Sequence, residues 1–297
     1  MKICTLCPRM CTVDRKSGER GVCGQTEEIK VARAALHFWE EPCISGEKGS
    51  GAVFFSGCAL HCVFCQNENI ANGTAGKVIS TERLGEIFLE LQEKGANNIN
   101  LVTPGQFVPQ IIKAVELARN QNLKIPIVYN TSSYENVDTI RSLEGIVDIY
   151  LPDFKYWNAA LSAKYSHAPD YPSMAKKAIE EMVRQTGAAV FENGEDSLMK
   201  RGTIVRHLIL PGCTKDSKAV LQYLHETYGN QIYISIMHQF TPLSNVEKYP
   251  ELNRKITERE YEDVVDFAVD IGIENGFIQE GETAEESFIP EFDNEGV

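Results

Sequence analysis

Three cysteines, Cys58, Cys62 and Cys65, stand close together in the sequence. Thiolate is the ligand type that zinc and iron–sulfur clusters select. A structural zinc site is normally closed by four Cys or His ligands, so three thiolates leave one position open. In an iron–sulfur cube held by three cysteines, one iron would stay free to bind a substrate or cofactor. We therefore expect a metal centre with an open position here, rather than three buried thiols that pack as small hydrophobic side chains.

The residues before these cysteines predict where they lie in the fold. Residues 52–55 read Ala-Val-Phe-Phe, an apolar run typical of a strand that is buried on both faces. The three cysteines would then stand on the loop that follows the carboxyl end of a core strand.

The cysteine loop also resembles a known family. Cys58-x3-Cys62-x-Phe64-Cys65, with its aromatic residue before the third cysteine, is similar to the signature of the radical S-adenosylmethionine superfamily. The flanking segments 39–46, 49–51 and 54–58, and Cys65-Gln66-Asn67, resemble the pyruvate formate-lyase activating enzyme-like branch, which is also similar to the AmmeMemoRadiSam proteins. The resemblance implies a [4Fe-4S] cluster on the three cysteines and S-adenosylmethionine as cofactor.

Strand-like and helix-like stretches alternate beyond the loop. Strands are predicted over 52–55, 98–103, 125–130, 146–154, 203–210 and 232–240, and the segment 29–39 before this series also reads as a strand. Helices are predicted over 81–95, 108–122, 172–187, 216–228 and 257–272, the last with a capping box at 257–260. A further helix is predicted after a capping box at 132–135, and a hairpin or loop insertion at 188–202. Six βα units predict parallel strands, and a closed eight-unit barrel takes roughly 250 residues. We therefore expect an α/β fold, a partial (β/α)6 TIM-like barrel.

Polar residues lie in or directly after the carboxyl-terminal part of each predicted strand. They are Thr103, Pro104 and Gly105 for the second strand, Asn130 for the third, Asp153 and Lys155 for the fourth, Arg206 for the fifth and His238 for the sixth. The carboxyl ends of parallel strands are where such folds collect their chemistry, so we expect these residues to meet the three cysteines.

The resemblance implies roles for these residues. Asp153-Phe154-Lys155 looks like the Asp-x-Lys motif that lines the S-adenosylmethionine pocket of glycyl-radical activating enzymes, and Met237-His238-Gln239 is similar to their aromatic-His motif. One departure is that the family's Gly-Gly-Glu after the second strand is here Thr103-Pro104-Gly105. The cofactor-binding residues implied are Phe64, Gln66, Asn67, Thr103, Pro104, Gly105, Asn130, Asp153, Lys155, Arg206 and His238.

A second group of cysteines, Cys4, Cys7, Cys11 and Cys23, lies near the N-terminus. Four thiolates could close around zinc or hold a second iron–sulfur cluster. The uneven spacing leaves open which cysteines are ligands, and Cys43 is a possible substitute. Because so short a region cannot bury a hydrophobic core, a metal would supply much of its folding free energy. We expect a small Cys-rich, metal-binding appendage over 1–48 and the main domain, with a C-terminal tail, over 49–297.

The composition limits the kinds of binding partner and the cellular compartment that we expect. A formal net charge of −13 over 297 residues argues against nucleic acid or an anionic membrane surface. Nine cysteines, an odd number, favour metal binding in a reducing compartment over disulfides. The chain shows neither a secretion signal nor an apolar stretch that could span a membrane. We therefore expect a cytoplasmic protein, working under anaerobic conditions.

The leading interpretation is a radical S-adenosylmethionine oxidoreductase. The resemblance implies that a low-potential donor, flavodoxin or ferredoxin, supplies an electron, that S-adenosylmethionine is cleaved to a 5′-deoxyadenosyl radical, and that this radical abstracts hydrogen from a protein or peptide. A glycyl-radical enzyme is one such substrate. One alternative is abstraction from a small metabolite or free peptide. Another is a non-catalytic iron–sulfur electron carrier or metal-stapled binding module, which would leave the polar strand ends without a purpose.

Overall fold

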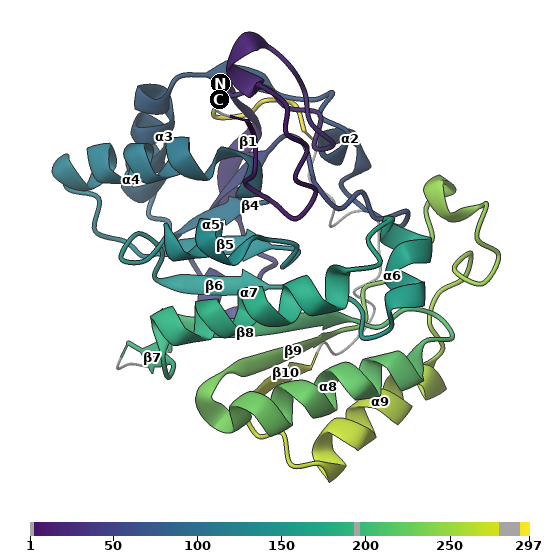
Figure 1. The fold of residues 1–297 in the computed structure, drawn as a ribbon. Coiled ribbons are helices and arrows are strands. Elements are labelled where there is room, and N and C mark those ends of the chain that lie inside the picture. Colours follow the sequence, from purple (N-terminus) through teal and green to yellow (C-terminus); the bar gives the residue numbers. More distant parts are fainter. Residues whose placement is uncertain (1–2, 193–196, 279–291) are drawn as a thin grey trace.

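The computed structural model describes residues 3–192, 197–278 and 292–297. Its strands form one sheet in the order β3-β1-β2-β4-β5-β6-β8-β9-β10, and β7 pairs with β8 off this path (Figure 1). The strands are β1 (Ile29–His37), β2 (Ser50–Phe55), β3 (Lys77–Ile79), β4 (Ile99–Val102), β5 (Ile127–Thr131), β6 (Ile149–Pro152), β7 (Val190–Phe191), β8 (Met199–Leu208), β9 (Tyr233–Met237) and β10 (Gly276–Ile278).

The α-helices connect these strands. They are α1 (Pro42–Ser45), α2 (Glu68–Ala71), α3 (Thr81–Glu93), α4 (Val108–Asn120), α5 (Val137–Arg141), α6 (Ala159–Ser166), α7 (Tyr171–Thr186), α8 (Thr214–Tyr228) and α9 (Glu258–Asp270). Within the described ranges, no helix is both long enough and apolar enough to cross a bilayer.

The parallel part of the sheet matches the prediction. Strands β2, β4, β5, β6, β8 and β9 pair in parallel, one after another, and are the six strands predicted in the βα units. The strand predicted over 29–39 is confirmed as β1, which pairs antiparallel with β2. Strand β3, antiparallel to β1, and strand β10, parallel to β9, were not predicted. In the described residues β3 and β10 are the two ends of the path, so the predicted α/β partial barrel is confirmed.

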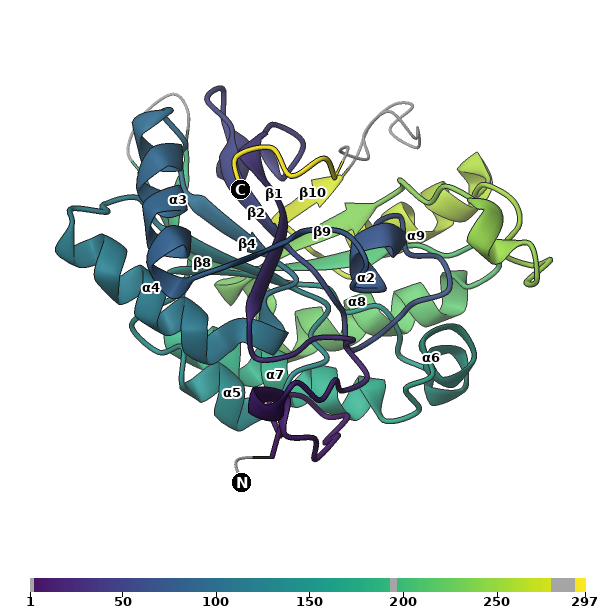
Figure 2. The same cartoon turned by 90° about the horizontal axis from the view of Figure 1, so that it is seen from above.

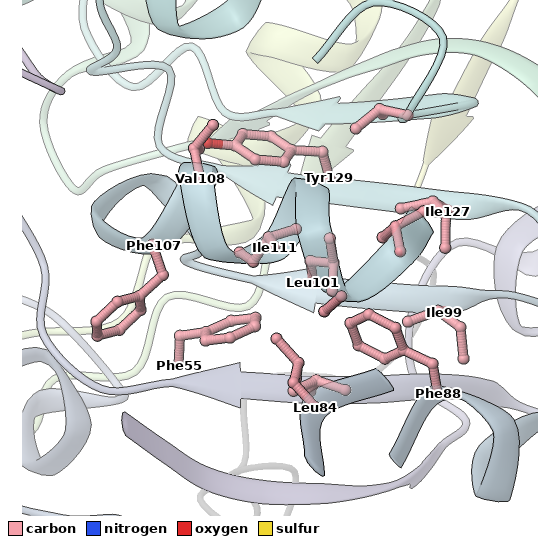
Figure 3. Packing of buried hydrophobic residues seen from close by; sticks show 14 of the residues in the cluster. Phe55, Leu84, Phe88, Ile99, Leu101, Phe107, Val108, Ile111, Ile127 and Tyr129 are labelled. Carbon is pink, nitrogen blue, oxygen red and sulfur yellow. The ribbon is translucent and has the colours of Figure 1, made fainter. Parts of the chain in front are cut away.

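The sheet is curved, and helices α3, α4, α5, α7, α8 and α9 lie along its outer side (Figure 2). Side chains alternate along each strand, so one set packs against these helices and the other faces the inside of the curve. Figure 3 shows the outer set, in which Phe55, Leu101 and Tyr129 pack with Phe88 and Ile111 of α3 and α4. The inner set is therefore available to form a site.

Two local predictions have opposite outcomes. At α9, the Thr257 side chain accepts from the Glu260 amide and the Glu260 carboxylate accepts from the Thr257 amide, which confirms that capping box. The box predicted at 132–135 is wrong, because α5 begins only at Val137. Glu135 is instead buried, and its carboxylate accepts hydrogen bonds from side chains of β5.

The remaining differences concern short elements. The hairpin predicted over 188–202 is confirmed by the antiparallel pairing of β7 with β8. Helix α6 was not predicted, and its weak amphipathicity explains why. Strand β1 lies within the segment expected to form the appendage, and it hydrogen-bonds to β2.

Candidate cofactor site

A cavity of about 480 Å³ lies at the carboxyl ends of the parallel strands. Its volume falls in the range of roughly 300–1,000 Å³ typical of ligand sites. It brings together most of the predicted residues: Cys58, Cys62, Cys65, Phe64, Gln66, Asn67, Thr103, Asn130, Asp153, Lys155 and Arg206. The rule that parallel strands gather polar groups at their carboxyl ends therefore correctly located these side chains.

Arg206, on the inner face of β8, is the centre of a buried polar network. Its Nε donates to Asp153 Oδ1 at 2.9 Å and its Nη1 donates to Glu40 Oε2 at 3.0 Å. Its Nη2 donates to Asn130 Oδ1 on β5. Lys155 Nζ completes the network by donating to Asp153 Oδ2 at 2.7 Å. The guanidinium fork thus fixes three neighbouring side chains at once.

The charges in this network hold one another in the ionised state. Burial alone would raise the pKa of Asp153, but Arg206 and Lys155 outweigh it and the pKa lies below its usual value. Burial likewise disfavours the charged form of Lys155, but the Asp153 carboxylate outweighs it and raises the lysine pKa. The pair is therefore ionised at neutral pH.

The sequence analysis missed two carboxyl groups that line the cavity, Glu40 and Glu41. Glu40 Oε1 accepts from Asn100 Nδ2 at 2.9 Å and from Asn130 Nδ2 at 3.3 Å. Glu41 is buried, and burial raises its pKa although Arg206 opposes the shift. The sequence did show two adjacent acidic residues between the strand predicted over 29–39 and Pro42. The direction in which their side chains point, however, depends on how the chain turns from β1 to β2.

The three cysteine sulfurs face the cavity from a hydrogen-bonded loop. Ser166 Oγ donates to Cys62 Sγ at 3.1 Å, and the Leu60 amide donates to Cys58 Sγ at 3.4 Å. Burial raises the pKa of the Cys65 thiol to about 12 in the metal-free chain. Metal binding at this loop would therefore release protons.

This donor set fits an iron–sulfur cluster with an open position. The three sulfurs border one cavity, and donors already point at Cys58 and Cys62, as a thiolate-bound cluster requires. In the described parts of the chain, no three Cys, His, Asp or Glu side chains stand close enough together to hold a single metal ion.

The structure does not bring Pro104, Gly105 and His238 into this cavity. Gly105 instead faces the Glu135 carboxylate, where a β-carbon would lie only 2.7 Å from Oε1. His238 packs edge-on against Tyr261, with ring centroids 4.6 Å apart, because strand alternation turns Met237 and Gln239 inward instead. A binding role for these three residues stays a prediction.

Thr103 does line the cavity, although its backbone differs from that of an ordinary strand end. Its φ is +56°, a left-handed conformation that is unusual for a β-branched residue. Its carbonyl accepts from Gln106 Nε2 at 2.8 Å. A glycine would adopt this backbone without strain, which is consistent with glycine in the related motif.

The four N-terminal cysteines line a smaller cavity of about 30 Å³. Cys4, Cys7, Cys11 and Cys23 all border it, and so do Cys58 and Glu135. Cys43 does not line this cavity and lies in a cluster of apolar residues with Val128 of β5 and Ile204 of β8. The position of the cavity places the two groups of cysteines next to each other.

Comparison with known proteins gives a consistent result. A family model described as the Radical SAM superfamily matches residues 52–224. An uncharacterized protein of Methanocaldococcus jannaschii is 27% identical over 278 residues, which cover 90% of this chain and 74% of that protein.

Several solved structures share the fold at low sequence identity. SuiB of Streptococcus suis bound to S-adenosylmethionine is 15% identical, with 75% of this chain and 48% of SuiB covered and a TM-score of 0.50. The structure of anSMEcpe with bound AdoMet and a peptide is 14% identical, with 72% and 57% covered and a TM-score of 0.52. HydG, a maturase of the [FeFe]-hydrogenase, is 14% identical, with 78% and 52% covered and a TM-score of 0.52. The chain thus spans about half the length of these solved proteins, and the likeness shows the fold alone.

Proposed function

Because this chain belongs to the radical SAM superfamily and is therefore a radical SAM enzyme, we propose that it binds a [4Fe-4S] cluster through Cys58, Cys62 and Cys65 and S-adenosylmethionine in the adjoining cavity. Such a cluster, when bound, supplies the electron that cleaves S-adenosylmethionine to methionine and a 5′-deoxyadenosyl radical. The observation that carries the proposal is that one cavity joins the three thiols to the buried network of Arg206 and Asp153.

The chemistry of S-adenosylmethionine fits the side chains in this cavity. Its carboxylate matches the Lys155 ammonium, which is buried near the Cys62 sulfur. Its ammonium and ribose hydroxyls need acceptors, and Asp153 and Asn130 supply carboxylate and amide oxygens. Its adenine needs an apolar surface, and Phe64 lines the cavity while packing against Phe240 at 6.0 Å between ring centroids. The chain's own task is to bind, orient and exclude water.

We further propose a protein or peptide as the substrate, with activation of a glycyl-radical enzyme as one form of that reaction. The cavity lining includes the large apolar side chains of Trp39 and Ile278, which are 65% and 46% exposed and offer a surface to a chain larger than the cavity. A protein of the same fold has been solved with a bound peptide. The proposal includes a low-potential electron donor, flavodoxin or ferredoxin, and an anaerobic cytoplasmic setting.

The test is anaerobic release of 5′-deoxyadenosine. Protein reconstituted with iron and sulfide, then given dithionite and S-adenosylmethionine, should release this product. Cys58→Ala, Cys62→Ala and Cys65→Ala should each abolish release, whereas Cys213→Ala, which lies outside the cavity lining, should retain it. Release at the wild-type level from any of the first three variants would show that the assignment is wrong.

A second measurement tests the substrate class. Deuterium from a labelled protein or peptide substrate should appear in 5′-deoxyadenosine. Transfer from small metabolites alone would favour the alternative of a metabolite-modifying enzyme.

A further inference from the structure

We propose that Cys4, Cys7, Cys11 and Cys23 hold a second metal centre, a thiolate-bound zinc ion or iron–sulfur cluster, separate from the one on the Cys58 loop. All four thiols line one cavity. Four thiolates are the ligand set that closes such a centre completely. The inference does not depend on the reaction proposed for the first site.

A backbone amide already points at one of the four sulfurs. The Val22 amide donates to Cys11 Sγ at 3.3 Å. Hydrogen bonds of this kind favour the charged form of the acceptor, which is the form that binds metal.

The fold is shaped to bring these sulfurs close to the backbone. Gly21 precedes the last cysteine, and a β-carbon at this position would lie 3.0 Å from Cys11 Sγ. A side chain at residue 21 would therefore require Cys11 to shift. A disordered tail with four unrelated thiols would have no such requirement.

A buried carboxyl group beside the thiols is a second, independent observation. Glu135 borders the same cavity and is only 5% exposed. Its Oε1 accepts from Thr131 Oγ1 at 2.7 Å, but its Oε2 finds no hydrogen-bond partner among the described residues. A buried polar atom without a partner is costly, so the described residues alone leave this cavity incomplete.

The N-terminal segment has little else to hold it in shape. Ile3, Met10 and Val22 are each about half exposed, so the segment buries few large apolar side chains. Its regular structure, in the described residues before β1, is one short 3-10 helix over Arg15–Ser17. A metal centre would supply the folding free energy that a core this small cannot.

The centre would also support the first site. Arg9 lies between Cys7 and Cys11, and its side chain donates to the Ala59 carbonyl at 2.8 Å and to the Ser166 carbonyl at 3.0 Å. Ala59 follows the first cysteine of the other loop directly. A metal that fixes the N-terminal loop would therefore also fix the loop that carries Cys58 and Cys62.

The sulfurs must still move to bind a metal. No three of them stand within reach of a single ion as the described side chains are arranged. Binding would draw the sulfurs inward, which the loop positions of Cys4, Cys7 and Cys11 allow.

The first experiment isolates this centre from the other one. The full chain carrying Cys58→Ala, Cys62→Ala and Cys65→Ala would be purified anaerobically, and its zinc, iron and sulfide measured. We expect roughly one zinc, or roughly two to four irons with matching sulfide, per chain. Adding Cys7→Ala or Cys23→Ala should remove this metal, and adding Cys213→Ala should not. A folded triple variant without metal, or metal that survives Cys7→Ala and Cys23→Ala, would overturn the proposal.

The second experiment needs no substitution in the N-terminal segment. Thiol alkylation of the same triple variant, read residue by residue by mass spectrometry, compares thiols of equal exposure. Cys7 is matched with Cys213, which is also partly exposed, and Cys23 with Cys43, since both are 8% exposed. Removing the metal should speed alkylation of Cys7 and Cys23 at least tenfold and leave Cys213 and Cys43 unchanged. Equal rates with and without metal at Cys7 and Cys23 would contradict the proposal.

Discussion

Replacing Arg206 with methionine should destabilise the protein by about 3 kcal/mol. The side chains of Arg206, Glu40 and Asp153 are only 13%, 9% and 14% exposed, so values for exposed ion pairs do not apply. Breaking a buried ion pair by removing one partner costs roughly 3–5 kcal/mol. We expect the lower end, because Asp153 keeps Lys155 and Glu40 keeps the amide of Asn100.

The pH dependence of this stability loss shows whether a buried carboxyl group left without Arg206 is its cause. Without Arg206, the burial of Asp153 is less well offset, so the pKa of this carboxyl group should rise in the folded state. A folded-state pKa that lies above the unfolded value adds stability as the pH falls. The loss caused by Arg206→Met should therefore shrink between pH 7.5 and pH 5.

Urea unfolding of metal-free protein under anaerobic, reducing conditions measures this loss. Arg206→Lys keeps the charge but loses the three-way fork, so its stability should lie between wild type and Arg206→Met. Arg201→Met, on an exposed position of the same strand, is the matched control and should stay within about 0.5 kcal/mol of wild type. In the double variant with Glu40→Gln, the two losses should fall short of additivity by roughly 0.5–3 kcal/mol. A loss under about 1 kcal/mol, or one that does not change with pH, would refute the reasoning.

Three further predictions concern stability, each measured by urea unfolding. Gly105→Ala should cost about 1–3 kcal/mol, because its β-carbon would meet Glu135, and the cost should disappear in a Glu135→Ala background. Wild-type stability should fall by up to about 3 kcal/mol from pH 6.5 to pH 4, because burial lowers the pKa of His207 to about 4 while the unfolded chain takes up its proton. His207→Gln should remove this part of the pH dependence, and an unchanged slope would contradict it. Thr257→Ala should lower the free energy of unfolding by about 1 kcal/mol, because it removes the side chain that caps α9. A loss smaller than that of an alanine substitution at a residue whose side chain caps no helix would contradict the role of the capping box.

Much of the fold could be predicted because local patterns agree with the tertiary structure. The strands that lie in the centre of the sheet read as continuous apolar runs, and helices such as α3 and α9 have a clear apolar stripe with a capping residue. Strand β10 is three residues long, which is too short for a period to show, and the eight residues of α6 carry no clear apolar stripe. Ser132-x-x-Glu135 matched a capping pattern, but burial of Glu135 against Thr131 outweighed that local preference.

The candidate site, like the fold, could be predicted from the sequence only in part. Asn130 and Arg206 lie near the carboxyl ends of β5 and β8, and Asp153 directly follows β6, so the topology alone places them together. Glu40 lines the cofactor cavity and Arg9 contacts the cysteine loop, both from irregular segments whose paths depend on hydrogen bonds to residues far along the chain. A pattern that extends over a few residues carries no information about such contacts.

The charge balance of the network bears on how the proposed cofactor would enter. Arg206 and Lys155 pair with Glu40 and Asp153, so two cations balance two carboxylates within this hydrogen-bonded network. The methionine end of S-adenosylmethionine carries one carboxylate and one ammonium. Lys155 would hold the carboxylate and Asp153 would hold the ammonium, so each of these two buried side chains would keep a partner of opposite charge. This requires Asp153 to stay in place when Lys155 turns away from it, and the hydrogen bond from Arg206 Nε provides that second attachment. Arg206 would therefore act as a positioning residue for the cofactor, because it holds the Asp153 carboxylate in place while Lys155 changes its partner.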